Sequence, residues 1–428
     1  MGSAQAFDEQ KADHALQFAQ EQVNRTASRP DIPTNRYPKT STDEGNWTLV
    51  RDNDRVGWTQ GFFPGLLWFM YEHSGDPAFK DKADAWTRNL EVQKTHSASH
   101  DVGFKFFPSY GQAYRLTGDP YYRDVLLTAA GSLAKRFDPT VGIINCCDWN
   151  APEWQVPLVT DTMMNLELLF WGAQNGGDPA WSDMALSHAM KTLTDMVRPD
   201  GGTFHVVDYD RAGNIRSRKT FQGYSDSSTW ARGHAWAIYG YTMAYRYTRD
   251  PRMLEAAQRV TGYYLDRLPP DSVPYWDFDV PAAQQVKDSS AAAAVASALL
   301  ELSTFVTDPI LARRYHDAAL AMLDSLSSPA YLAEGTGSPG VLLHGVAFFR
   351  TPIKPKGEAI DKSLIYGDYY FVEALLRFKA SQKPKPATPE APAPDEDKGC
   401  AAAPGGSLAV AGLMLWLLRS RRRSRLGA

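Results

Sequence analysis

Cysteine is scarce in this chain of 428 residues, where only Cys146, Cys147 and Cys400 occur. Three cysteines cannot form the disulfide framework of a small secreted domain, and a bridge between two adjacent residues strains the backbone. We therefore expect no structural disulfide and interpret Cys146 and Cys147 as buried apolar side chains. No His–Asp set lies beside them in the sequence, which argues against a nucleophilic thiol.

Positive charge is not in excess either, because 45 Lys and Arg face 49 Asp and Glu and the formal net charge is −4. Nucleic acids and anionic membrane surfaces are bound by concentrated Lys and Arg, so neither is expected as a bulk partner. An acidic ligand would need local cations. A glycine-rich phosphate loop and a zinc-spaced Cys/His set are also missing, and no metal site is predicted.

Hydrophobic and aromatic residues, by contrast, are plentiful. They make up 43% and 12% of the sequence, with 12 Trp and 20 Tyr, which is enough to build large cores and excludes wholesale disorder. Flat aromatic faces suit both protein cores and sugar rings, so the position of these residues in the fold has to decide between the two uses.

The composition divides the chain into four parts. Residues 1–6 contain Ala4-Gln5-Ala6, which has the small-x-small form of a signal-peptide cleavage site, and residues 7–382 are expected to form one folded domain. Residues 383–399 are rich in proline, alanine and acidic residues and are interpreted as a linker. Residues 400–428 hold an apolar stretch, slightly short of the ~20 residues of a spanning helix, and an arginine-rich end. The alternative for this last part is a solvated tail packed on the body.

A short turn with Asp directly before Pro recurs between segments of helical apolar periodicity. Asp at the N-cap accepts from free helix amides, and Pro at the first helical position sacrifices no hydrogen bond. Each copy therefore ends one helix and begins the next. The five copies are Ser74-Gly75-Asp76-Pro77, Thr117-Gly118-Asp119-Pro120, Gly176-Gly177-Asp178-Pro179, Thr248-Arg249-Asp250-Pro251 and Thr307-Asp308-Pro309.

Twelve helices are expected from the apolar periodicity, beginning near residues 7, 59, 77, 104, 120, 161, 179, 230, 251, 289, 309 and 366. Tight Asp-Pro turns alternate with long connections, so all the long connections emerge at one end of a closed double ring. We therefore predict an all-α fold, an (α/α)6 toroid, with the binding site on the rim of long loops. These loops span 28–58, 94–103, 138–160, 198–229, 268–288 and 328–365.

Asp161 is the most informative acidic residue of that rim. It begins a helical segment and has apolar neighbours on both sides, and desolvation by such neighbours raises the pKa of a carboxyl group. We therefore predict a proton donor at Asp161. The alternative is a helix N-cap, a role that does not exclude catalysis. Asn165, one helical turn later, lies on the same face and could orient the acid.

Other polar and aromatic residues fall on the same rim. Asp101 would supply the second carboxylate that glycoside chemistry uses. His205, Gln222 and Arg232 offer hydrogen bonds and positive charge for the carboxylate of an acidic sugar, although a lone histidine is more often structural. Tryptophans gathered at the cavity mouth favour a carbohydrate platform over a core role; they are Trp149, Trp154, Trp230, Trp236 and Trp276.

Seven sequence strings occur in the order typical of one enzyme family. They are Trp58-Thr59-Gln60-Gly61-Phe62-Phe63-Pro64-Gly65, HDVGF at 100–104, the segment from Asp161 to Leu169, SSTWARGHAW at 227–236, YWDF at 275–278, KDSSA at 287–291 and YGDYYFVEALLR at 366–377. Over about residues 8–380 the chain thus resembles glycoside hydrolase family 88, the unsaturated glucuronyl hydrolases.

The resemblance implies hydration of the C4=C5 double bond that a polysaccharide lyase leaves on a terminal uronic acid. Protonation at C4 and addition of water at C5 give a hemiketal, which opens and releases the neighbouring sugar. It further implies Asp161 as the general acid and then the base, Asp101 as a holder of sugar hydroxyls, and no cofactor. The substrate-contacting positions that it implies are Trp58, His100, His205, Gln222, Trp230, Arg232 and Trp236.

Some questions stay open from the sequence. His234 stands where the family has Gln, so the contacts there are undecided. The alternatives are an unsaturated rhamnogalacturonyl hydrolase acting on pectin fragments, an inverting glycosidase acting on saturated sugars, and a surface sugar-binding protein without catalysis. The preferred linkage, the tolerance of sulfate and the oligomeric state are not predicted.

The end of the chain carries a second resemblance. Gly399-Cys400, the short apolar segment and the arginines up to Arg425 resemble the C-terminal sorting tag of myxobacterial surface proteins, the MYXO-CTERM type. That resemblance implies export, contact with a membrane or sorting machinery, removal of the apolar segment and retention at the cell surface or outer envelope. Cys400 would be the lipidation site.

Overall fold

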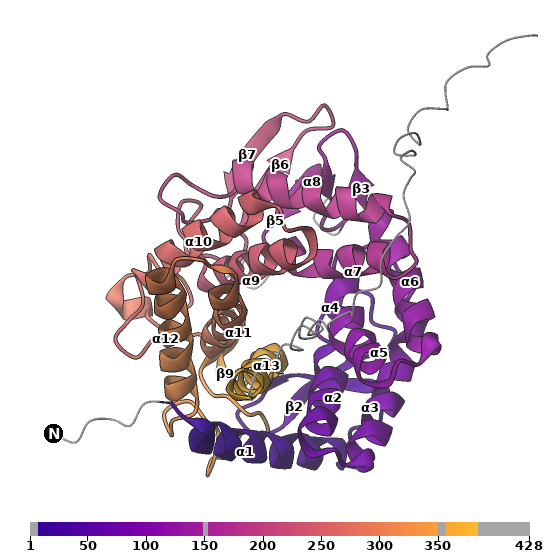
Figure 1. Cartoon of the computed structure of the whole chain (residues 1–428), viewed down its shortest axis with the longest axis vertical. Helices are drawn as coiled ribbons and strands as arrows, with labels where there is room; N and C mark the ends of the chain where they lie inside the picture. Colours follow the sequence, from indigo (N-terminus) through magenta and orange to yellow (C-terminus); the bar gives the residue numbers. More distant parts are fainter. Residues whose placement is uncertain (1–6, 149–152, 350–355, 384–428) are drawn as a thin grey trace, which may run out of the picture. The chain divides into compact units, whose positions relative to one another are not determined.

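The computed structural model describes residues 7–148, 153–349 and 356–383. Contacts divide the chain into two units, Met1–Lys383 and Pro384–Ala428, and all described residues belong to the first. That unit is a double ring of helices (Figure 1), which confirms the predicted (α/α)6 toroid. Within the described residues, no helix is long and apolar enough to cross a membrane.

The inner ring is built from helices that are buried on nearly every side, as expected of helices that are apolar all round. Its members pack against one another in a closed circle (Figure 1). They are α2 (Phe62–Ser74), α4 (Val102–Phe106) continued by α5 (Gln112–Thr117), α7 (Thr162–Gln174), α9 (Ala231–Thr248), α11 (Ser289–Phe305) and α13 (Ile365–Gln382).

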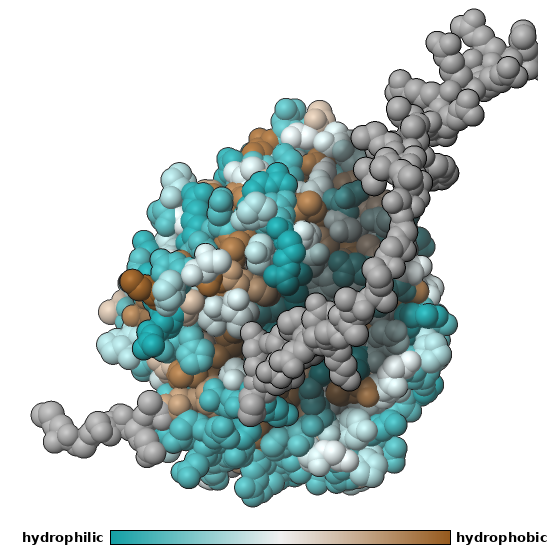
Figure 2. Space-filling view, viewed as in Figure 1, coloured by the Kyte–Doolittle hydropathy of each residue, from teal (hydrophilic) through white to brown (hydrophobic). Residues whose placement is uncertain are grey.

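The outer ring covers the inner one with amphipathic helices, each packed on inner neighbours and exposed on its other face. The face seen in Figure 2 is accordingly mostly hydrophilic along these helices. They are α1 (Glu9–Ala27), α3 (Pro77–Asn89), α6 (Pro120–Ala134), α8 (Ala180–Asp195), α10 (Pro251–Leu265) and α12 (Pro309–Leu326), and two 3-10 turns, η1 (Leu90–Gln93) and η3 (Ala282–Gln284), lie in the connections.

The fourth helix departs from the prediction, because it is not one regular helix. A π-helical turn, η2 (Phe107–Gly111), separates α4 from α5. Pro108 lies in this turn and has no N–H to donate to the preceding turn, which explains the local widening.

Four of the five Asp-Pro turns have the predicted Asp at the N-cap and Pro at the first helical position, whereas α8 begins one residue later and has Pro179 at its N-cap. The carboxylate of each Asp accepts the backbone N–H of the residue two positions later, at 2.9–3.0 Å. Every turn leads from an inner helix to an outer one. The inner helices therefore all end at the rim of tight turns and all begin at the rim of long connections.

The long connections carry short antiparallel strands arranged in four small sheets. The three-stranded sheet has the order β5-β6-β7 and joins two connections that are about 50 residues apart in sequence. The strands are β1 (Arg36–Ser41), β2 (Trp47–Arg51), β3 (Phe137–Asp138), β4 (Ile143–Ile144), β5 (Val156–Val159), β6 (Val206–Tyr209), β7 (Ile215–Lys219), β8 (Gly345–Phe348) and β9 (Glu358–Lys362).

The caps can be tested at Asp119, which accepts the N–H of Tyr121 at 2.9 Å. Asp119→Ala removes the acceptor, and we expect the free energy of unfolding in a urea titration to fall by about 1 kcal/mol. Asp119→Asn keeps an acceptor oxygen and should lose much less. An equal loss in both variants would show that the charge, and not the cap, is what stabilises this turn.

Candidate active site

The β5–β6 pairing brings Asp161 and His205 together. Val159 is paired with Val206, and just beyond this pair the N–H of Thr160 donates to the carbonyl of His205 at 3.3 Å. The next side chain, Asp161, then lies with Oδ2 3.5 Å from Nε2 of His205. The sheet register thus places a carboxyl group and an imidazole side by side on the rim.

His205 is held in one tautomer. Its Nδ1 accepts the backbone N–H groups of Phe221 at 3.1 Å and Gln222 at 3.0 Å. Because a backbone N–H only donates, Nδ1 carries no proton, and these partners assign the ring proton to Nε2. The ring also packs on Trp230, with centroids 4.6 Å apart. His205 therefore presents an N–H to the Asp161 carboxylate.

The pKa of Asp161 is lowered, so the predicted upward shift is wrong. Burial by itself raises this pKa, but the hydrogen bond from His205 opposes it and the fields of His100 and Arg232 add to that opposition. The net result is a pKa below the usual value for aspartate. The prediction considered only the covalent neighbours of Asp161, whereas the deciding groups come from other connections.

The side chain of Asp161 does not cap its helix, which was the alternative role for this residue. It occupies the N-cap of α7, but its carboxylate caps no amide, and its side chain is 20% exposed. Asn165 does not orient the carboxylate. Its Nδ2 donates to the backbone carbonyl of Asp161 at 3.2 Å, and its Oδ1 accepts the N–H of Phe104 at 2.7 Å. Asn165 therefore fixes α7 against α4.

His100 contacts Asp101 on one side and the residue after Asp161 on the other. The Asp101 carboxylate accepts the Ser99 hydroxyl at 2.7 Å and lies 3.3 Å from Nε2 of His100. Nδ1 of His100 is 2.8 Å from the hydroxyl of Thr162, the residue after Asp161. Asp101 makes no capping bond for α4 and is 19% exposed. Both carboxylates are therefore partly exposed, and each lies beside a histidine, Asp101 beside His100 and Asp161 beside His205.

Arg232 supplies a fixed positive charge beneath this pair. Its guanidinium is 2% exposed and donates to Asp288 at 2.9 Å, to Gln222 at 3.1 Å and to the carbonyl of Ala347 at 2.6 Å. It also lies 4.6 Å from the ring of Trp230. These donors bind protein groups, so Arg232 affects a ligand through its field and by orienting Gln222.

The aromatic residues are placed differently from the prediction. Trp58 is partly exposed and packs on Tyr366, with centroids 4.7 Å apart, which suits a stacking position. Trp236 is fully buried between Phe104 and Tyr370, so the prediction that it stacks on a sugar is wrong. Three more tryptophans, predicted at the mouth, lie in the cores of the long loops instead, namely Trp154, Trp230 and Trp276. Trp149 lies outside the described residues.

Three polar neighbours of the site were not among the predicted site residues. Ser99 and Thr162 bind Asp101 and His100, and only their adjacency to the acidic residues could have indicated them. Tyr366 has a buried hydroxyl without a hydrogen-bond partner among the described residues. Burial and the nearby carboxylates, Asp161 included, raise the pKa of this phenol, so it stays protonated as a donor. Its position at the start of α13 was the available signal.

The prediction of no structural disulfide is wrong, because Cys146 and Cys147 form a disulfide. Hydrogen bonds on both sides hold the segment: the N–H of Cys146 donates to Pro157 at 3.2 Å, and the N–H of His100 donates to Cys146 at 2.8 Å. This tertiary support, which the sequence does not reveal, keeps the adjacent sulfurs together. Cys400 lies outside the described residues.

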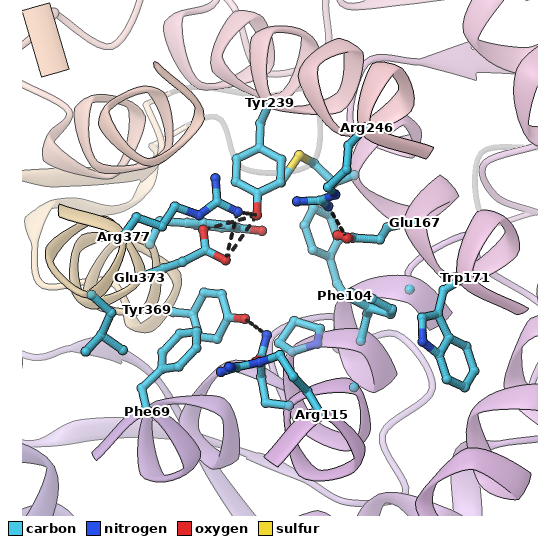
Figure 3. A pocket seen from close by; sticks show the side chains of 18 of the residues that line it. Phe69, Phe104, Arg115, Glu167, Trp171, Tyr239, Arg246, Tyr369, Glu373 and Arg377 are labelled. Carbon is cyan, nitrogen blue, oxygen red and sulfur yellow. Dashed lines mark hydrogen bonds and ion pairs between the residues drawn. The ribbon is translucent and has the colours of Figure 1, made fainter. Parts of the chain in front are cut away.

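A separate cavity of about 530 Å³ lies at the opposite ends of the inner helices (Figure 3). Phe104 lines it and also packs on Trp58, so this side chain separates the cavity from the two carboxylates. Arg246 forms ion pairs with Glu167 and Glu301 there, which places cations at helix C-termini. Burial raises the pKa of Glu167. The candidate site therefore lies at the rim of long connections, and this cavity is separate from it.

His234, the departure from the family pattern, has a structural role near the start of α9. Its Nε2 donates to the carbonyl of Val260 at 2.8 Å, and its Nδ1 accepts the hydroxyl of Thr203 at 3.1 Å. It is fully buried, and burial lowers its pKa to about 4. His234 therefore ties α9 to α10 and to the long connection that contains Thr203.

Comparisons with known proteins agree with this geometry. The profile of the family described as Glycosyl Hydrolase Family 88 matches residues 33–337. The chain is 44% identical, over 75% of its length and 79% of the relative, to an unsaturated glucuronyl hydrolase of Formosa agariphila. It is 33% identical, over 86% and 92%, to an unsaturated chondroitin disaccharide hydrolase of Streptococcus pyogenes.

The solved structures show the same likeness. A crystal structure of an unsaturated glucuronyl hydrolase specific for heparin superposes with a TM-score of 0.81 at 37% identity. The match covers 87% of this chain and 98% of that one.

Stability should fall in acid partly because of His234. The pKa of His234 in the folded protein lies below the value of about 6.5 in the unfolded chain. The contribution of His234 to the free energy of unfolding is therefore complete above pH 6.5 and is lost as the pH falls toward 4. That loss is about 3 kcal/mol at most. His234→Gln keeps a donor and an acceptor without titrating, and we expect a flatter pH dependence of urea unfolding.

His316→Gln, at a partly exposed position on α12, is the matched control. If the free energy of unfolding of the His234 variant depended on pH as steeply as that of the unsubstituted protein, the lowered pKa of His234 would be contradicted.

Proposed function

Because the chain belongs to glycosyl hydrolase family 88 and is an unsaturated glucuronyl hydrolase, we propose that Asp161 and Asp101 carry its reaction. The enzyme hydrates the C4=C5 double bond of a terminal unsaturated uronic acid on a small oligosaccharide. The observation that carries the residue assignment is that both carboxylates cap no helix, are partly exposed and lie beside a histidine, Asp101 beside His100 and Asp161 beside His205.

The chemistry follows from one proton donor. Protonated Asp161 gives its proton to C4 of the sugar, and positive charge develops at C5 and the ring oxygen. Water adds at C5 and returns a proton to the Asp161 carboxylate, so that water is added overall and the acid is restored. The hemiketal opens, and the hemiacetal left at C1 releases the neighbouring sugar. Asp101 holds the sugar hydroxyls and stabilises the positive charge.

Substrate binding has to supply the protonated form of Asp161, since its pKa is low in the free protein. The substrate carries a carboxylate and displaces water from around Asp161, and both changes disfavour a second negative charge. The pKa of Asp161 therefore rises in the complex. The N–H of His205 keeps the carboxyl group in place in both states.

The rim attracts an anionic sugar although the chain has a net charge of −4. All the inner helices begin there, and helix N-termini carry partial positive charge. The field of Arg232 also lowers the pKa of Asp161, although the guanidinium is paired with buried Asp288. Partly exposed Trp58 offers a flat face beside these charges.

The relatives favour lyase products of glycosaminoglycans over the alternative of pectin fragments. One is named an unsaturated chondroitin disaccharide hydrolase, and a structural neighbour is specific for heparin. We therefore propose an unsaturated glycosaminoglycan disaccharide as the substrate. Parallel assays on chondroitin, hyaluronan, heparin, gellan and pectin fragments test this choice. Faster turnover of the pectin fragment would favour the rhamnogalacturonyl alternative.

We also propose that the enzyme acts at the cell surface. The support is the Gly399-Cys400 pair with its apolar segment and arginines, all of which lie outside the described residues. Recovery of the protein from washed membranes, and its loss from them in Cys400→Ser, would agree with a lipid anchor at that cysteine. Release of both forms into the medium would contradict it.

Replacing the acid tests the mechanism directly. In Asp161→Asn we expect the loss of ultraviolet absorbance of an unsaturated disaccharide to slow by about 10²–10⁴-fold, because the amide cannot donate and retake the proton. Sugar binding should largely remain. Asp183→Asn, at an exposed position on α8, makes the same chemical change away from the rim. Full activity of the Asp161 variant would refute the assignment.

The pH dependence should reveal the shift in the pKa of Asp161. The kcat/KM profile reports the free enzyme, where this pKa lies below the usual value, so kcat/KM should decline from acidic pH upward. The kcat profile reports the complex, where the pKa is higher, so its decline should begin at a higher pH. Coincident basic limbs would exclude uptake of the proton with the substrate.

A further inference from the structure

A small cavity lies on the same rim, between two of the long connections. Its volume is about 290 Å³, and one wall is the connection from β2 to α2 while the other is η1 and the loop after it. The wall contains a guanidinium, an imidazole, amide and hydroxyl groups, and no carboxylate. The residues are Asn53, Arg55, Val92, Gln93, Thr95, His96, Ser97 and Ala98.

The imidazole of His96 is the unexplained group in this wall. Both of its ring nitrogens are shielded from solvent and have no hydrogen-bond partner among the described residues. A shielded donor or acceptor without a partner costs free energy, and native proteins rarely leave one unless a ligand or water completes it. Three cations surround the ring and, together with burial, lower its pKa: Lys105, Arg55 and Arg136.

The cavity is linked to the candidate site through the helix that begins after Asp101. Lys105, one turn after Asp101 on α4, is buried and donates to Oε1 of the lining residue Gln93 at 2.9 Å. The amide of Gln93 in turn donates to the carbonyl of Asp54 at 2.8 Å, which ties the two walls together. Lys105 therefore connects the wall of the cavity with the helix that carries Asp101 at its N-cap.

One exposed apolar side chain lines the cavity. Val92 is 64% exposed and lies among the polar lining residues. A single exposed valine is normal on a protein surface, but beside a polar cavity it suits the C–H face of a sugar ring.

We propose that this cavity is a subsite for an anionic substituent, a sulfate or a carboxylate, on the sugar chain beyond the bond that the enzyme breaks. The inference rests on the proposed function, because that function brings a sugar chain to Asp101. Arg55 would pair with the anion, His96 would donate to it, and the hydroxyl groups of Thr95 and Ser97 would complete its shell.

Kinetics on matched substrates tests the subsite. The reference is an unsulfated unsaturated disaccharide, whose only anionic group is the terminal uronate. The two substrates with an additional anion, called the anionic substrates, are its sulfated form and an unsulfated tetrasaccharide whose next uronate supplies the carboxylate. In Arg55→Ala we expect the ratio of KM for the anionic substrate to KM for the reference to rise about tenfold, the loss of one charged hydrogen bond. A rise with only one of the two anionic substrates identifies the source of the anion.

Arg51→Ala is the matched control, since Arg51 is exposed at the end of β2, outside the lining, and carries the same charge. It should leave the KM ratios unchanged. Equal ratios in the two variants would overturn the proposal, and so would an equal loss on all three substrates in Arg55→Ala, because that loss would place Arg55 in the reaction itself.

A binding measurement keeps this test separate from the activity. Sodium sulfate should shift the ring resonances of His96 in isotope-labelled full-length protein relative to sodium chloride at equal ionic strength, and the shift should disappear in Arg55→Ala. An absent shift in the unsubstituted protein would overturn the subsite even if unsaturated disaccharides are hydrolysed. Conversely, a shift in a protein that consumes no double bond would refute the proposed function and leave an anion site.

Discussion

The antiparallel pairing of β5 with β6 is the constraint on which the candidate site depends. Val159 and Val206 are buried partners, and a shift of one residue would turn their side chains to the other face of the sheet. The observed register leaves Asp161 and His205 just beyond the pair, on the same side. The backbone amides of the following connection then hold His205 in one tautomer. A packing requirement of two valines thus orients the proposed proton donor.

The direction of the inner helices separates two environments. Their N-termini meet at the rim of long connections, where partial positive charge and Arg232 face the candidate site. Their C-termini meet at the tight turns, where Arg246 and Arg377 compensate the opposite partial charge within a network of glutamates. The network stabilises one end of the helical ring, and the other end remains available for the candidate site. The side chain of Phe104 lies between these two ends.

The differences between prediction and structure have a common cause. The apolar neighbours of Asp161 in the sequence predict a raised pKa, but His205, from another connection, outweighs their effect. The position of Trp236 near a loop predicts a sugar contact, but the helix turns its ring into the core. The adjacency of Cys146 and Cys147 argues against a bridge, but tertiary hydrogen bonds hold them in one. In each case the deciding group is remote in the chain.

The sequence by itself determined the ring of helical hairpins, the place of each tight turn and the alternation of short and long connections. Those features depend on apolar periodicity and on caps within a few residues, as at Asp119 and Pro120. It also identified Asp101, Asp161 and their family through local strings. Only the tertiary structure decided the charge state of Asp161, because ionisation depends on groups that approach through space. It likewise decided that His234 ties two helices together, since its partners come from distant segments.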